Sequence, residues 1–313
     1  MNAGKPIEKH SAQQALRLKW IPDRSVSYGV CITFENENSV NEVKYEVKVS
    51  RLKPGSNNEP LFLIERTSEV FVNEGIPELV ADRLAYEAGK VFYPLVISVD
   101  NNGGFERVYN HEEIIKRWPK IKSKLLSNFD GEMTDYYIAN MEKLLAIPLN
   151  VTNVFGKNDW LINTFFKPLY KVYQKDKIEK MAFPILNNSN VDNYLIAEKF
   201  DKNPNSFGVI EVLHEGNIEL ENTDNFEQAF GNYQGRYFLH PKYKYIISLM
   251  SDFSISRYIN AKVKVRIFMV PEDGRDFDYD FLSTFDENNT ISSRSVILDG
   301  PPQKSFWERL LNF

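Results

Sequence analysis

The feature that most constrains the fold is a run of alternating residues between Gly231 and Val270. Four apolar residues there alternate with mostly basic ones: Val263, Val265, Ile267 and Met269 against Lys262, Lys264, Arg266 and Phe268. Successive side chains of a strand point to opposite faces, so period two indicates a strand with one buried face. With a turn expected at 240–244, the run predicts an antiparallel meander that needs a cover on its apolar face.

A second β-rich stretch lies near the start of the chain, between 27 and 73. In its middle, Val43, Tyr45, Val47 and Val49 alternate with polar residues. The segments "NENSVN" and "KPGSNNEP" supply the Asn, Gly and Pro typical of chain reversals. This stretch predicts three strands in a second antiparallel meander.

The strongest hairpin signal follows, in "VFYPLVISVDNNGGFERVYN". Two apolar segments flank the turn residues 101–104, where Asn and Gly tolerate the positive φ of tight hairpins. The Gly-Gly pair matches neither of the glycine-rich phosphate-loop patterns, so a turn is the better interpretation. Asn110 is then the expected N-cap of a helix, with Glu113 three residues on.

Two or three helices are predicted between the β-rich parts. The first has an apolar side at helical spacing, and Pro119 should kink or divide it. That side consists of Ile114, Ile115, Trp118, Ile121, Leu125 and Phe129. A second helix is expected over 133–146, and a third apolar segment over 158–173 is interrupted by Pro168. These helices are the expected cover for the sheet.

Strands return at 193–200 and at 207–220, where Gly216 and Asn217 form an expected turn, and a short helix is expected over 222–231. From Pro271 the pattern decays. The segment 305–313 gathers four apolar residues on one side of two helical turns: Trp307, Leu310, Leu311 and Phe313. Such a short helix is marginal alone in water, so we expect it to be ordered only where that side is buried, on the body or on a partner.

These elements predict an α+β fold with a mainly antiparallel curved sheet, or sheets, and a helical insertion in the middle of the chain. Residues 1–15 are expected to be a flexible N-terminus and 271–313 an irregular segment with a short terminal helix. Residues 16–270 form the α+β body, which is β-rich over 16–110, helical over 111–175 and β-rich over 176–270. Whether the β-rich parts form one sheet or two domains stays open.

Composition narrows the functional classes. The net charge of -5 gives no overall attraction to nucleic acid or to an anionic membrane. A lone cysteine, Cys31, rules out an internal disulfide, and its apolar neighbours predict a buried strand position. No apolar run is long enough for a membrane helix, and the first residues lack the apolar core of a signal peptide. The expected location is cytoplasmic, or periplasmic or secreted if a leader has been removed.

No reaction motif stands out. The four histidines lack zinc-helix spacing, and there is no G-x-S-x-G element, so neither catalytic residues, nor a metal, nor a cofactor is predicted. Alternating Asp276, Asp278 and Asp280, with Glu287 further on, are similar to the start of a calcium loop. Phe281 stands where that loop needs Gly, which favours an edge strand with an acidic wet face.

The leading functional hypothesis is a non-enzymatic binding or assembly protein that acts through a protein–protein interface. A protein partner or a homo-oligomer is expected, with Trp307, Leu310, Leu311 and Phe313 as the contact residues. The alternative is a carrier of an apolar small molecule between sheet and helices, with Trp118, Tyr237 and Tyr45 in the cavity wall. The third hypothesis is an enzyme of unrecognised type, which a polar pocket with convergent titratable groups would favour.

Overall fold

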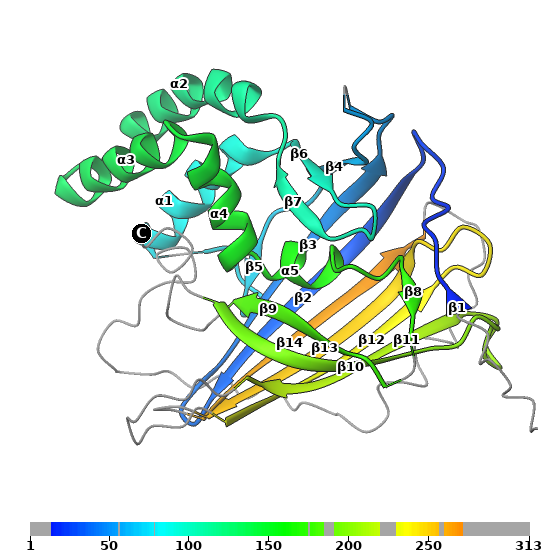
Figure 1. The fold of residues 1–313 in the computed structure, drawn as a ribbon. Coiled ribbons are helices and arrows are strands. Elements are labelled where there is room, and N and C mark those ends of the chain that lie inside the picture. The colour runs from blue at the N-terminus through cyan, green and yellow to red at the C-terminus, as the bar shows by residue number, and fades with distance from the viewer. Residues whose placement is uncertain are drawn as a thin grey trace, which may run out of the picture.

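The fold is known from a computed structural model that describes residues 14–271, except 56, 78, 175, 185–190, 220–229 and 257–259. Its main feature is one twelve-stranded sheet in the order β7-β6-β4-β3-β2-β14-β13-β12-β11-β10-β9, with β5 paired to β3. All neighbouring strands are antiparallel, and the sheet does not close on itself. Both β-rich parts of the chain therefore belong to a single sheet (Figure 1).

The two parts meet where β2 (Ser25–Asn36) pairs with β14 (Asn260–Val270), near the start and end of the described chain. The pairing runs from Ala261 opposite Asn36 to Val270 opposite Ser27. We call this junction the seam. Hydrogen bonds along its whole length make the two meanders one surface.

The first meander confirms the predicted strands. β2 is followed by β3 (Val40–Arg51), β4 (Leu61–Arg66) and the short β5 (Phe71–Val72). The predicted hairpin is also present, as β6 (Leu95–Val99) and β7 (Phe105–Val108). In its turn, the Asp100 carboxylate accepts hydrogen bonds from the Asn102 and Gly104 amides at 2.8 and 2.7 Å. Gly103 has φ of 88°, and a β-carbon there would lie 2.6 Å from the Tyr170 ring.

The second meander consists of β9 (Ile178–Pro184), β10 (Val191–Phe200), β11 (Ile210–Ile218), β12 (Phe230–Leu239), β13 (Ile246–Ser256) and β14. The predicted turn at Gly216 and Asn217 is wrong, because both residues pair within β11, opposite Tyr233 and Asn232. A β-carbon on Gly216 would lie 2.5 Å from the Leu195 carbonyl, so this glycine permits a close strand approach. The helix expected over 222–231 lies mostly outside the described residues. Two short strands, β1 (Gln14–Ala15) and β8 (Val172–Tyr173), form a separate pair.

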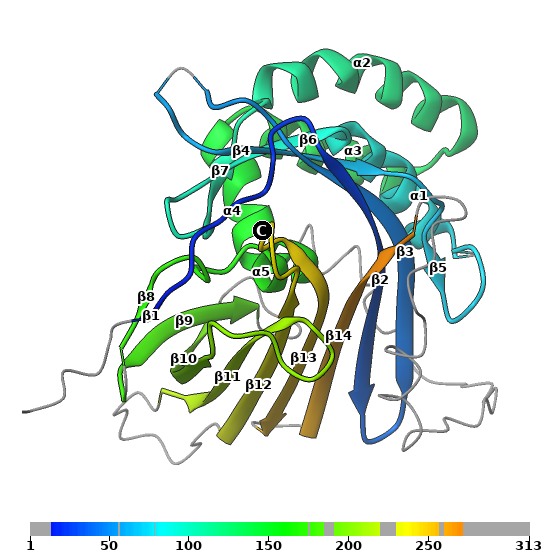
Figure 2. The same cartoon turned by 90° about the vertical axis from the view of Figure 1, so that its right-hand side faces the viewer.

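Within the described residues, five α-helices accompany the sheet: α1 (Val80–Gly89), α2 (His111–Asn128), α3 (Glu132–Leu145), α4 (Pro148–Asn158) and α5 (Trp160–Phe165). A 3-10 turn, η1 (Lys90–Phe92), follows α1. Both views show the helices on one side of the sheet (Figures 1 and 2). The predicted helices α2 and α3 are confirmed, whereas α1 and α4 had no sequence signal strong enough to predict them.

Two details of α2 differ from expectation. Asn110 precedes the helix, but its side chain makes no cap: it accepts from Val96 N at 2.9 Å and donates to Pro94 O at 3.0 Å. Asn110 therefore ties the helix start to β6. Pro119 does not divide the helix, which is continuous from His111 to Asn128. The third predicted segment ends as helix at Phe165, before Pro168.

Helix α5 packs against the seam through its aromatic residues. The Trp160 ring lies 6.3 Å from Phe34 of β2 and 5.0 Å from Phe253 of β13, centroid to centroid. The Phe165 ring lies 5.1 Å from Tyr28 of β2, edge to face. The Tyr28 hydroxyl donates to Ile246 O at 2.7 Å. These contacts hold strands of both meanders against one helix.

Cys31 is not in a buried position, contrary to expectation. It lies on the outer face of β2, half-buried, and its thiol donates to Glu42 Oε2 at 3.2 Å. Burial and the neighbouring Glu42 raise its pKa to about 11. The thiol is therefore protonated at neutral pH and poorly reactive.

We expect Trp160→Ala to lower the free energy of unfolding by about 3–5 kcal/mol, because it leaves a cavity between the seam and α5. Leu149→Ala, at a side chain that is 63% exposed, is the matched control and should change it by less than about 1 kcal/mol. Urea unfolding measures both. Equal effects of the two substitutions would contradict the role given to α5.

Candidate functional site

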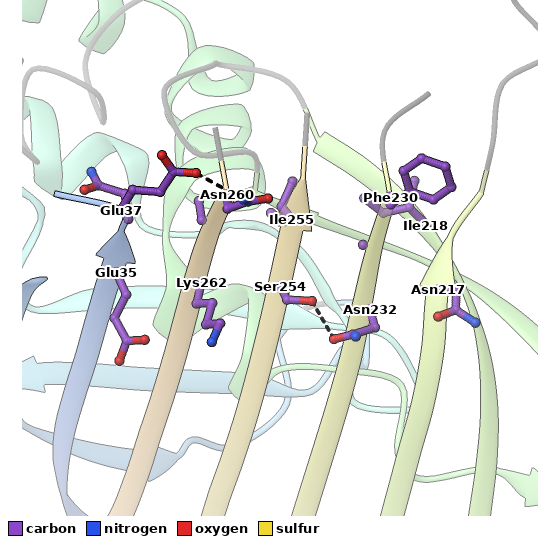
Figure 3. Close-up of a pocket in the computed structure, with 13 residues that line it drawn as sticks. Glu35, Glu37, Asn217, Ile218, Phe230, Asn232, Ser254, Ile255, Asn260 and Lys262 are labelled. Carbon is purple, nitrogen blue, oxygen red and sulfur yellow. Dashed lines mark hydrogen bonds between the residues drawn. The ribbon is translucent and has the colours of Figure 1, made fainter. Parts of the chain in front are cut away.

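A pocket lies where β2, β14, β13, β12 and β11 end or begin, beside the seam (Figure 3). Its volume is about 730 Å³. Both faces of the sheet contribute to its lining, which consists of Glu35, Asn36, Glu37, Asn217, Ile218, Phe230, Gly231, Asn232, Ser254, Ile255, Asn260, Ala261 and Lys262. We call it the strand-end pocket.

One part of the lining comes from the inner face, the face that carries the core. Cross-strand pairing places Asn36, Ala261, Ile255 and Gly231 in one row. Ile218 extends the row, since a β-carbon on Gly231 would be 2.5 Å from Ile218 Cδ1. Apart from Asn36, this inner row is apolar, and Gly231 allows the Ile218 side chain to pack closely beside it.

The other part comes from the outer face, one residue along each strand. Figure 3 shows a row of polar side chains across five strands: Glu35, Lys262, Ser254, Asn232 and Asn217. Ser254 Oγ donates to Asn232 Oδ1 at 2.8 Å. Phe230, which is 61% exposed, lies beside this outer row. The strand ends thus join an apolar row to a polar one.

The charges of the pocket nearly balance. Lys264, just beyond the lining, pairs with Glu35 at 2.6 Å. Glu37 accepts a hydrogen bond from Asn260 Nδ2 at 3.0 Å. Lys262 adds a cation, and the remaining polar groups are amides and a hydroxyl. Such a surface offers hydrogen-bond donors and acceptors without a strong electrostatic field. It therefore suits an uncharged polar group of a ligand.

A second set of functional groups lies deeper on the inner face. Pairing places Ser251, Gly235, His214 and Glu198 in one row across β13, β12, β11 and β10. His214 Nε2 is 3.2 Å from Glu198 Oε1, and Lys171 Nζ is 2.7 Å from Glu198 Oε2. We call these residues, with Tyr233 and Tyr237, the buried polar cluster.

Gly235 makes room for the Tyr233 side chain of the cluster. A β-carbon at this position would lie 2.2 Å from the Tyr233 hydroxyl oxygen. That hydroxyl is 3.3 Å from the Tyr237 hydroxyl, which donates to Thr164 O of α5 at 3.1 Å. The cluster therefore links the sheet to α5 through polar contacts.

Burial governs the ionisation of these groups. Burial lowers the pKa of His214, and Glu198 only partly offsets it, so the imidazole is neutral at pH 7. Burial opposes ionisation of Glu198 too, but His214 and Lys171 outweigh it and lower its pKa. His214 is 1% exposed. A substrate cannot reach it in this conformation, so the cluster serves to tie β10 and β11 to the segment after α5.

Lys167 is the other buried cation on this side. Its ammonium donates to Ala182 O at 2.7 Å and lies 3.9 Å from the centre of the Phe183 ring. Burial lowers its pKa to about 7. One hydrogen bond and one aromatic face replace the water that the ammonium loses.

The sequence-predicted wall residues lie elsewhere and apart. Tyr45 of β3 is buried beneath the Arg66 guanidinium, 5.4 Å from the ring centre. Trp118 of α2 is buried and donates to Glu142 at 3.5 Å, and Tyr237 belongs to the buried polar cluster. None of the three lines the strand-end pocket. The predicted contact residues Trp307, Leu310, Leu311 and Phe313 lie outside the described residues.

The pocket residues carried no usable signal in the sequence. Its asparagines at 36, 217, 232 and 260 have the appearance of ordinary turn residues. Among the described residues, no three His, Cys, Asp or Glu side chains are grouped so as to hold a metal ion. Asp276 and its neighbours lie outside that part of the chain. None of the described helices is both long and apolar enough to cross a membrane.

Comparison with known proteins identifies no family for this chain. No protein-family model matches the sequence. No curated protein matches it either. A solved structure described as "Lipid-protein interactions in lipovitellin" aligns with a TM-score of 0.43 and 10% identity, over 82% of this chain and 26% of the lipovitellin chain. A likeness this low carries no argument about this protein.

Lys167 should make stability depend on pH. Its folded pKa of about 7 lies below the ordinary lysine value of 10.5, so between these values the unfolded chain binds more protons. The free energy of unfolding should therefore rise by up to about 4 kcal/mol from pH 7 to pH 10 relative to Lys167→Met. Urea unfolding at both pH values measures this difference.

Lys199→Met is the control, because the Lys199 side chain is 67% exposed and forms only a surface pair with Glu215. It should keep the wild-type pH dependence. If Lys167→Met also keeps it, Lys167 is not neutralised by burial.

Proposed function

We propose that the protein binds an amphipathic small molecule in the strand-end pocket. The apolar part of the ligand lies against the inner row, and its uncharged polar part lies along the outer row. The observation that carries the proposal is the meeting of these two rows at the same strand ends. A ligand with one apolar and one polar end would contact both rows at once.

The size of the pocket supports a ligand of ordinary small-molecule dimensions. Its volume of about 730 Å³ lies within the roughly 300–1,000 Å³ that is typical of small-molecule sites. Ile218, Ile255 and Phe230 provide apolar surface. Each Å² of apolar ligand surface removed from water contributes about 25 cal/mol. Burial of the apolar part therefore drives binding, and the polar row selects the head group.

The proposal keeps the hypothesis of an apolar-ligand binder but moves the site. The ligand lies at the ends of the strands rather than between sheet and helices. In this proposal the sheet curves around α5, and the helices inserted in the middle of the chain cover its inner face. A cavity walled by Trp118, Tyr237 and Tyr45 stays a sequence-based prediction that the proposal does not use.

Filling the pocket should abolish binding of an apolar reporter. Ala261 lies in the inner row between Asn36 and Ile255, so Ala261→Phe places a ring in the pocket. We expect it to weaken binding of N-phenyl-1-naphthylamine, followed by its fluorescence, at least tenfold, or about 1.4 kcal/mol. Ala139→Phe, at an exposed position of α3, is the matched control and should leave affinity unchanged.

Circular dichroism and urea unfolding confirm that both variants are folded before they are compared. Equal reporter affinity in wild type and both variants would place the site elsewhere, and no saturable binding to wild type would remove the proposal. Competition tests the head group: octyl glucoside should displace the reporter at lower concentration than octanoate, because the nearly balanced charges of the pocket do not compensate for the water that a carboxylate loses on binding. Preference for octanoate would contradict the assignment of the outer row.

A further inference from the structure

Several exposed apolar side chains lie at one end of the helical layer, on elements that do not line the strand-end pocket. α1 and α2 are antiparallel neighbours: Lys124 pairs with Glu87 at 2.7 Å, and the Arg83 guanidinium lies 5.8 Å from the centre of the Phe129 ring. The start of α1, the end of α2 and the start of α3 therefore share one end of this layer (Figure 1).

Five large apolar residues at this end are exposed, and we call them the helix-tip patch: Leu79, Val80, Leu126, Met133 and Tyr136. Leu79, Met133 and Tyr136 are 68%, 58% and 71% exposed. Met133 and Tyr136 are three residues apart on α3 and so share one face. Single exposed apolar residues need no explanation, but a group at one site indicates a binding surface.

Acidic residues lie around the helix-tip patch. Asp130, Glu132 and Asp135 lie at the same helix ends, whereas Lys124 is already paired with Glu87. Arg83, over the Phe129 ring, adds one positive charge, so the carboxylates outnumber it. An occupant that fits must therefore be apolar on one side and basic at its margin.

The segment 305–313 of the same chain has these properties. Trp307, Leu310 and Leu311 follow helical spacing. Lys304, just before the segment, and Arg309 within it are opposed by Glu308, so the side chains of residues 304–313 carry a net charge of +1. From Pro271, the last described residue, residues 272–304 separate the sheet from this segment. Extended at about 3.3 Å per residue, they reach roughly 110 Å, well beyond the ~27 Å length of an eighteen-residue helix such as α2.

We propose that the segment 305–313 docks on the helix-tip patch of its own chain, with its apolar side on Met133, Tyr136 and Leu79. The covalent tether favours this over docking on a second copy, because it raises the local concentration of the segment. Docking buries four large apolar residues of the segment, which satisfies the condition under which so short a helix is stable.

Tryptophan fluorescence reports on the docked segment directly. Of the four tryptophans, Trp20, Trp118 and Trp160 are buried in the described fold, so the difference between wild type and Trp307→Phe isolates Trp307. We expect Trp307 to emit at short wavelength and to resist acrylamide. The double substitution Met133→Asp and Tyr136→Asp should shift its emission to longer wavelength and expose it to acrylamide. Leu149→Asp, at an equally exposed residue outside the patch, should do neither.

Disulfide trapping identifies the occupant. In a Cys31→Ser background, which removes the single native thiol, Met133→Cys with Asn312→Cys should form a disulfide within one chain. Leu149→Cys with Asn312→Cys should not. Disulfides between chains would assign the patch to a second copy and overturn the proposal. A Trp307 that is open to acrylamide in wild type, or buried but insensitive to the patch substitutions, would overturn it as well.

Discussion

The pairing of β2 with β14 is the interaction on which the rest of the structure depends. It joins residues more than two hundred positions apart, from Ala261 opposite Asn36 to Val270 opposite Ser27. Contacts so distant in sequence carry a large loop-closure cost, which must be offset by hydrogen bonds and packing along the whole seam. The packing comes from α5, whose Trp160 and Phe165 contact aromatic residues of β2 and β13. Without the seam, each meander would expose an edge and a bare apolar face.

The strand-end pocket follows from the same pairing. Asn36 and Glu35 come from one meander, and Ala261, Ile255, Gly231 and Ile218 come from the other. Only the seam brings them together. The two faces of a sheet carry different chemistry, apolar toward the core and polar toward water, and at the strand ends a ligand can contact both. The amphipathic binding site that we propose therefore needs no special motif. It arises from the alternation that also specifies the fold.

Local patterns explain which elements could be predicted from the sequence. Period two at 263–269 and the Asn-Gly turn before Phe105 act over a few residues, so these strands and the hairpin were predicted correctly. The sequence predicts a turn at Gly216, which is wrong. A glycine is needed there because the Leu195 carbonyl lies close, and that carbonyl belongs to another strand. The pocket and the helix-tip patch could not be predicted for the same reason: both are made by residues that only the tertiary fold brings together. Tyr45 and Tyr237 are predicted wall residues because both lie in alternating strand patterns. Such a pattern gives the face of the sheet on which a side chain lies but not the residues that surround it.

In the function that we propose, the ligand contacts both rows of the pocket across the seam. The most direct measurement is an NMR map of backbone amide shifts while octyl glucoside is added below its micelle concentration. Binding across the seam predicts saturable shifts on both of its sides, at Asn36 and Ala261, and along the rows at Ile255 and Asn232. Shifts confined to the residues around Tyr45 and Trp118 would place the ligand between sheet and helices and contradict binding in the strand-end pocket. Shifts that do not saturate would contradict it as well.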